Sequence, residues 1–205
     1  MMARKKQPHV AAQVTEERII EAASSVFSKE GYRGATTKRI AEAAGVNEIT
    51  LFRRFKSKEN VLRRVLEDKG TAIQKVMDQS LIMEEDADVV DCLRNLSVLT
   101  SGPLIGEWEL MMPLMEQSNI RPLIAEYMFS AVKSLMARLN RFFKFHIEVG
   151  NIRSINPDVA TAIFFGYLAS PMNRPQLMGT GRSKEEGEKT FDDFINIFMG
   201  GISKD

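Results

Sequence analysis

Residues 36–55 read TTKRIAEAAGVNEITLFRRF, which is two short helical patterns on either side of a glycine. Ile40 and Ala41 give the first pattern a small apolar side, against which a second helix can pack closely. Gly45 can adopt the positive φ that a helix end requires, and Asn47 is a favourable N-cap for the next helix. Two short helices joined by such a turn are typical of the helix-turn-helix unit that binds DNA. Glycine-linked pairs of amphipathic helices also occur in other all-helical proteins.

The second of these helices, expected at about residues 47–54, has two contrasting sides. Leu51 and Phe55 lie one turn apart and are expected to be buried against the first helix. Ile49 and Phe52 are expected to face outward, which is unusual for a helix that is merely solvated. Apolar side chains in that position can contact thymine methyls in the major groove. The outward set is Glu48, Ile49, Phe52 and Arg53.

The net charge of +1 is unevenly distributed along the 205 residues. Residues 1–69 contain 15 Lys/Arg and 9 Asp/Glu, a difference of +6, and the remainder contains 13 and 18, a difference of −5. A basic first third joined to an acidic remainder indicates that only the first third meets a polyanion. The alternative is that these charges serve solvation alone.

Cysteine usage and hydrophobicity indicate a soluble protein of the cytoplasm. The single cysteine, Cys92, excludes an internal disulfide and suits a reducing compartment. The basic N-terminal residues are not followed by the apolar stretch of a signal peptide. No run approaches the roughly 20 apolar residues that span a bilayer, so no membrane association is expected.

The apolar periodicity is helical throughout and predicts an all-α fold without internal repeats. A basic flexible arm is expected at 1–14, a helix-turn-helix domain at 15–60, and a helical ligand-binding and dimerisation domain at 61–205. About nine helices are expected, near residues 15–31, 37–44, 47–54, 58–77, 87–101, 104–117, 120–150, 158–169 and 183–202.

A longer series of residues in the first third has a family resemblance. The series is Arg18-Ile19-Ile20, Ala22-Ala23, Phe27, Gly31-Tyr32, Thr36-Thr37, Ile40-Ala41, Ala44-Gly45-Val46, Leu51-Phe52, Phe55, Ser57-Lys58-Glu59 and Leu62. Over about residues 15–65 this order resembles the DNA-binding head of the tetracycline-repressor (TetR) family. Beyond residue 80, only the order of helices and the RSINPD sequence at the start of the eighth helix resemble the family.

The resemblance implies a homodimeric regulator on double-stranded operator DNA, usually a repressor that a small molecule releases. It implies that Thr37 and Lys38 contact phosphate and flanking DNA, and that Lys58 clamps a phosphate. Phe52 stands where the family usually has Tyr, and Ile49 where a small residue or proline is common, so no relative's operator can be transferred. The implied recognition-helix positions are Asn47, Glu48, Ile49, Thr50, Phe52 and Arg54.

Several charged residues have two interpretations. Arg53 shares the outward side with Ile49, whereas family position favours Arg54; either guanidinium could grip phosphate or a guanine. Glu48 could accept from a cytosine amino group or simply favour the helix dipole. Residues 4–6 (Arg-Lys-Lys) could follow the duplex or could form a solubilising tail.

The aromatic and methionine-rich middle of the chain predicts a ligand cavity in the second domain. Such residues at helical spacing are most often core, but methionine adapts its shape to apolar ligands, and the chain has 12. Cys92 is expected to behave as a small buried hydrophobe rather than a redox sensor. Polar anchoring could come from Arg94, Glu109, Tyr127 and Asn140. The predicted pocket residues are Cys92, Trp108, Met111, Met112, Met115, Tyr127, Phe142 and Phe143.

The last two predicted helices have apolar residues on more than one side, which favours packing against a second copy of the chain. The alternative is that both helices only close the core of one protomer. The predicted interface residues are Ala162, Phe165, Gly166, Phe191, Phe194, Ile195, Phe198 and Met199.

No catalytic set, metal site or cofactor is expected. His9 and His146 are far apart in the sequence, and no His, Asp or Glu cluster has ligand spacing. The sequence therefore favours a ligand-responsive repressor with an unidentified hydrophobic effector over a ligand-independent DNA-binding dimer, and both over an enzyme. The operator, the effector, the regulated genes, the sign of regulation and the number of dimers per operator are left open.

Overall fold

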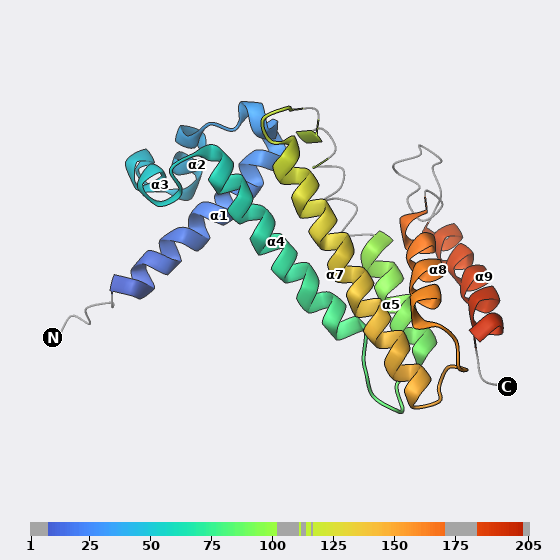
Figure 1. Ribbon diagram of the computed structural model, residues 1–205. Helices are drawn as coiled ribbons and strands as arrows, with labels where there is room; N and C mark the ends of the chain where they lie inside the picture. Colours follow the sequence, from blue (N-terminus) through green and yellow to red (C-terminus); the bar gives the residue numbers. More distant parts are fainter. Residues whose placement is uncertain (1–7, 102–110, 112–113, 116, 171–183, 203–205) are drawn as a thin grey trace. The chain divides into compact units, whose positions relative to one another are not determined.

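The structure is a computed structural model that describes residues 8–101, 111, 114–115, 117–170 and 184–202. All regular elements in this part of the chain are α-helices (Figure 1), so the predicted all-α class is confirmed. The helix expected at 104–117 lies mostly outside these residues. The helices are α1 (Pro8–Gly34), α2 (Thr37–Ala44), α3 (Glu48–Phe55), α4 (Lys58–Ser80), α5 (Val89–Ser101), α7 (Arg121–Glu148), α8 (Pro157–Ala169) and α9 (Lys184–Ile202).

The helix boundaries follow local signals in the sequence. Asn156 caps α8 through its side chain, which accepts from the backbone N–H of Asp158, and Pro157 occupies the first turn. Gly31 has φ 66° and interrupts α1, close to where a helix end was expected. The start of α1 differs from expectation, because residues 8–14 belong to this helix and not to a flexible arm. Proline is tolerated in a first helical turn, so Pro8 does not prevent this earlier start.

The chain forms two compact units. The first comprises the described residues within Met1–Thr71 and Met112–Ala125, and the second those within Ala72–Met111 and Glu126–Asp205. These units divide after Thr71, inside α4, whereas the sequence predicts a domain boundary after residue 60. A single continuous helix explains the difference: its apolar stripe does not pause at residue 60, and Val65 and Leu66 are still buried.

The second unit has a core of aliphatic side chains and interlocked aromatic rings. Phe143 of α7 contacts Phe164 of α8 and Phe198 of α9, with ring centroids 6.3 and 5.8 Å apart. Tyr167 stacks on Phe194 at 4.0 Å, which joins α8 to α9 a second time. Edge-to-face and stacked pairs of this kind add to the free energy gained by burial alone. No helix in the described part of the chain is both long and apolar enough to cross a membrane.

Candidate nucleic-acid interface

The turn between α2 and α3 is built by its sequence as predicted. Gly45 ends α2 with φ 64°, and its N–H bonds back to α2 carbonyls. A Cβ at this position would lie 2.8 Å from Nη2 of Arg18, which itself donates to the Ala44 carbonyl at 2.7 Å. Asn47 then caps α3, because its Oδ1 accepts from the backbone N–H of Ile49 at 2.8 Å. The positive φ therefore favours glycine in this turn, and a Cβ there would also require the end of the Arg18 side chain to shift.

The two sides of α3 are as unlike as the sequence predicted. Leu51 and Phe55 are buried, with 0% and 7% of their surface exposed. Ile49 and Phe52 are exposed by 75% and 58%, and Arg53 is exposed beside them. Burial of the first pair holds the helix on the unit and leaves the second pair toward solvent.

Two predicted DNA contacts at the start of the helices pair with one another. The hydroxyl of Thr37 at the start of α2 donates to Oε1 of Glu48 at the start of α3, at 2.6 Å. Lys38, beside Thr37, is exposed, and Thr50 is half-buried. The pair ties the beginnings of α2 and α3 together.

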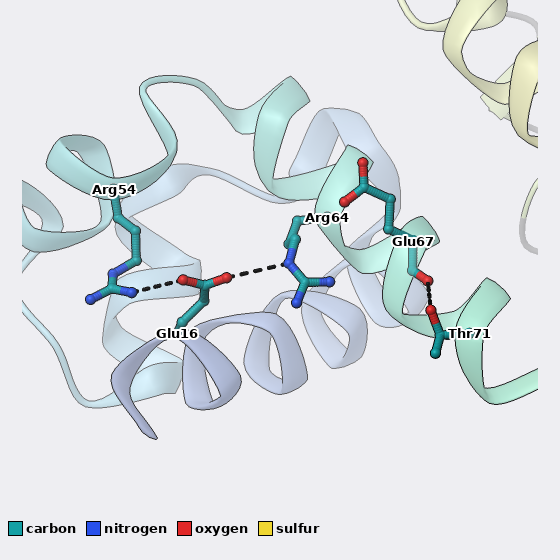
Figure 2. A network of polar contacts seen from close by, with 5 residues as sticks. All are labelled: Glu16, Arg54, Arg64, Glu67 and Thr71. Atoms are coloured by element: carbon teal, nitrogen blue, oxygen red, sulfur yellow. Dashed lines mark hydrogen bonds and ion pairs between the residues drawn. The ribbon is translucent and has the colours of Figure 1, made fainter. Parts of the chain in front are cut away.

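The two arginines of α3 have different environments. Arg54 is half-buried, and its Nη1 donates to Oε2 of Glu16 in α1 at 2.7 Å, while Nε of Arg64 in α4 donates to the other carboxylate oxygen at 3.3 Å (Figure 2). The hydrogen bond from Arg54 holds the pKa of Glu16 below its ordinary value, although burial acts in the opposite direction. Among the residues that the structure describes, Arg53 has no ion-pair partner. The structure therefore presents Arg53, and not Arg54, on the outward side.

Lys58, the predicted phosphate clamp, is engaged within the first unit. Its Nζ donates to the carbonyl of Tyr32 at 2.6 Å and lies 4.2 Å from the centroid of the Tyr32 ring. Burial lowers the pKa of the ammonium. The side chain thus fixes the first turn of α4 to the end of α1.

Two residues of this site were missed by sequence reasoning. The sequence patterns point to neither Glu16 in α1 nor Arg64 in α4 as a residue of this site. Arg54 is 38 positions from Glu16, so no periodicity or spacing rule connects them.

Three of the predicted pocket residues, Cys92, Phe142 and Phe143, share one hydrophobic cluster of the second unit. Cys92, Phe142 and Phe143 are buried in the core of the second unit, where burial raises the pKa of the Cys92 thiol. Met111 is buried, Tyr127 is half-buried in the same unit, and half-buried Met115 belongs to the first unit. Trp108 and Met112 lie outside the described residues. Of the suggested anchors, Arg94 pairs with Asp192 and Asn140 donates to Asp158, both at 2.6 Å, while Glu109 lies outside the described residues.

The predicted dimer residues differ in how much surface they leave exposed. Phe191, Ile195 and Phe198 are buried in the core of their own protomer, because this side of α9 packs inward, and they have almost no surface to offer a partner. Phe165, Phe194 and Met199 are half-buried against that core. Ala162 and Gly166 are exposed on α8. The large apolar residues that remain exposed on these helices are Val159, Ile163 and Ile197.

Comparison with known proteins identifies relatives of both units. The family described as "Bacterial regulatory proteins, tetR family" matches residues 19–65. The uncharacterised HTH-type transcriptional regulator YvkB of Bacillus subtilis (strain 168) is 30% identical over 194 residues, which cover 93% of this chain and 98% of YvkB. The similarity therefore extends well beyond the helix-turn-helix region.

Solved structures share the fold over most of the chain. A crystal structure assigned to the TetR family, from Mesorhizobium loti MAFF303099, has a TM-score of 0.81 at 21% identity and covers 94% of this chain and 98% of that one. The regulator FadR of Bacillus subtilis, in complex with stearoyl-CoA, has a TM-score of 0.58 at 18% identity, with coverages of 90% and 98%. At such identities the likeness concerns the fold alone.

Proposed function

Because the chain belongs to the TetR family of bacterial transcriptional regulators, which bind DNA through a helix-turn-helix, we propose that it is a homodimeric repressor. The dimer occupies a near-palindromic operator and leaves it when an apolar small molecule binds the second unit. The observation that carries this proposal is the α2–α3 pair, with one side of α3 buried at Leu51 and the other exposed at Ile49 and Phe52. A helix held in this way can enter the major groove without rearrangement.

The exposed faces of α8 and α9 support the dimer. Val159 and Ile163 are both 52% exposed and lie one turn apart on α8, and Ile197 of α9 is 80% exposed. Gly166 lies on the same side of α8, where a Cβ would meet no atom within 4 Å. Apolar side chains beside open glycine positions suit close packing of helices from a second protomer.

The effector part of the proposal depends on the helix shared by the two units. Residues of α4 belong to the first unit up to Thr71 and to the second from Ala72, so a ligand that shifts this helix can act on both. An apolar effector is supported by FadR, whose structure contains stearoyl-CoA. Binding that favours one arrangement must weaken DNA affinity by the same factor, typically about 5- to 150-fold.

A ligand-independent DNA-binding dimer is the alternative. Phe142 and Phe143 were predicted to line a pocket, yet both are completely buried and packed with other aromatic rings. A second unit with a fully packed core would serve dimerisation alone. Titration of operator complexes with acyl-CoA thioesters and free fatty acids separates the two functions. Only the ligand-responsive repressor is expected to bind DNA more weakly when such a compound is added.

Selection from a random pool of duplexes tests the central proposal. The purified full-length protein is expected to enrich an inverted repeat whose half-sites are about 34–36 Å apart, and its affinity is expected to fall steeply with salt. Enrichment of no sequence over the starting pool would refute operator binding.

Sedimentation of a charged variant tests the dimer. Ile197→Asp is expected to shift the protein toward monomers and to reduce operator affinity. Asn95→Asp, which adds the same charge at an exposed position of α5, is the matched control and is expected to leave the dimer intact. A monomeric wild-type protein, or equal behaviour of the two variants, would contradict the proposed interface.

A further inference from the structure

The outward side of α3 is defined by three exposed residues, Ile49, Phe52 and Arg53, which we call the recognition face. Exposure of two large apolar side chains on an eight-residue helix is costly in water, because each gains free energy once it is buried. Leu51 and Phe55 already anchor the helix, so the recognition face is not needed for folding. Its apolar surface is therefore available for burial against a binding partner.

Polar side chains next to the recognition face are already engaged. Glu48 accepts the hydroxyl hydrogen bond of Thr37 at 2.6 Å, and Arg54 is paired with Glu16 at 2.7 Å. Asn47 uses its Oδ1 for the helix cap. The recognition face itself thus presents one guanidinium and two apolar groups.

The charge around the face indicates which partner fits. Arg53 and Lys38 are exposed cations beside the apolar pair, and residues 1–69 carry a net charge of +6. Cations that flank an apolar surface complement a groove lined by phosphates, and the one apolar group that a major groove displays is the thymine 5-methyl. An apolar protein surface would not require this surplus of positive charge.

We infer that each operator half-site places two thymine methyl groups against Ile49 and Phe52. The inference rests on the proposed DNA-binding function and specifies what that site reads. Three residues of helix advance about 4.5 Å along the axis, whereas base pairs follow one another at about 3.4 Å. The two thymines therefore lie on neighbouring base pairs or are separated by a single base pair, on either strand.

The experiment removes one methyl group at a time from the DNA. The operator is first obtained by selection from random duplexes with the full-length protein. Each thymine of the half-site is then replaced by deoxyuridine, which lacks only the 5-methyl, and dissociation constants are measured by fluorescence anisotropy at constant salt. The proteins compared are wild type, Ile49→Ala and Phe52→Ala. Phe129→Ala, which truncates an exposed phenylalanine of the second unit, is the matched control.

Two thymines per half-site are expected to be sensitive in the wild type. Loss of each buried methyl should weaken binding about fourfold. Sensitivity at one of the two positions should disappear in Ile49→Ala and at the other in Phe52→Ala, while Phe129→Ala should retain both. Because Ile49 and Phe52 are exposed, the melting temperatures of their variants should match that of the wild type, so unfolding would not confuse the result.

The outcomes separate this inference from the proposed function. If an operator is selected but no deoxyuridine changes affinity, or if wild type and both variants lose the same factor at the same positions, the inference is overturned and DNA binding stands. If no sequence is enriched at all, the proposed function fails first. If the Ile49 and Phe52 variants change self-association and not DNA binding, the recognition face is a protein contact and the inference is wrong.

Discussion

Arg54 of α3 donates to Glu16 of α1 across 38 positions of sequence, at 2.7 Å, and the same carboxylate accepts from Arg64 of α4 (Figure 2). One carboxylate thus connects three helices of the first unit. The pair is only partly exposed, so solvent and salt weaken it less than they would a pair on an open surface. Its position at the end of α3 means that it holds the helix that carries the recognition face.

A double-mutant cycle should detect this connection in stability. Glu16→Gln and Arg54→Gln should each lower the free energy of unfolding by about 1 kcal/mol, and the double variant should lose less than the sum, by roughly 0.2–1 kcal/mol. Glu21→Gln, an exposed neighbour on α1, is the control and should have little effect. Urea unfolding monitored by circular dichroism measures the free energy of unfolding of the wild type and of these four variants. Strict additivity would show that the observed pair contributes no coupling.

Acid sensitivity gives a second view of the same carboxylate. The pKa of Glu16 is lowered from its ordinary value of 4.5, mainly by the hydrogen bond from Arg54. A carboxyl whose folded pKa is depressed stabilises the protein above its unfolded pKa, and this contribution is lost as pH falls through the folded value. Between pH 5 and pH 3 the wild type should therefore lose stability faster than Glu16→Gln. If the free energy of unfolding falls with pH in parallel for the two proteins, Glu16 is not the group responsible.

Arg53 and Arg54 should differ in function as they differ in environment. Arg53→Ala should weaken operator binding by about 1–3 kcal/mol and relax the choice of base at one position, with an unchanged melting temperature, because Arg53 is exposed and available to a guanine. Arg54→Ala should lower the melting temperature instead. Binding assays on the selected operator and on single-base variants measure both effects. If Arg54→Ala alters base choice and Arg53→Ala does not, the assignment is reversed.

Local sequence was sufficient for the helix-turn-helix. Asn47, Gly45 and the alternation of Leu51 with Phe52 each act within one or two turns of helix, where cap chemistry and periodicity are decisive. The all-α class followed from the same periodicity. These features depend on neighbours in the sequence and could be read without a structure.

Long-range pairing could not be predicted in this way. Glu16 binds Arg54, and Lys58 donates to Tyr32, 26 positions away. A single sequence does not specify which of several cationic side chains will pair with a distant carboxylate or carbonyl. For the same reason, periodicity predicts an apolar side for α9 but not what covers it, and Phe191, Ile195 and Phe198 pack into the core of their own protomer.

Lys58 should matter for stability more than for DNA binding. In Lys58→Met the stem remains but the donor to the Tyr32 carbonyl is lost, and a partly buried acceptor left without its bond costs about 1–3 kcal/mol. Lys75→Met, at an exposed position of the same helix, is the control and should be close to neutral. The salt dependence of operator binding should be unchanged. If stability is unaffected and the slope of log K against log salt falls by about 1, Lys58 is a phosphate contact after all.

His146 joins two loops of the second unit in its neutral form. Its side chain is completely buried; Nε2 lies 3.1 Å from the carbonyl of Ile82, and Nδ1 lies 3.1 Å from Nδ2 of Asn151. An amide nitrogen can only donate, so Nδ1 is the acceptor and Nε2 carries the proton. The same Asn151 nitrogen donates to the carbonyl of Glu85 at 2.9 Å. A second proton on the ring would oppose the Asn151 donor and break this arrangement.

Mild acid should therefore destabilise the second unit through His146. Burial lowers the pKa of His146 below its ordinary value of 6.5, so the unfolded state binds the proton first, and stability declines as pH falls from about 6.5 toward the folded pKa. The slope cannot exceed about 1.4 kcal/mol per pH unit for one group. His146→Gln, which keeps a donor for the Ile82 carbonyl, should be less stable at pH 7.5 but should lack this decline. Chemical unfolding at several pH values measures it, and an NMR titration is simple because the chain has only two histidines. An equal decline in the wild type and the variant would assign the effect to other groups.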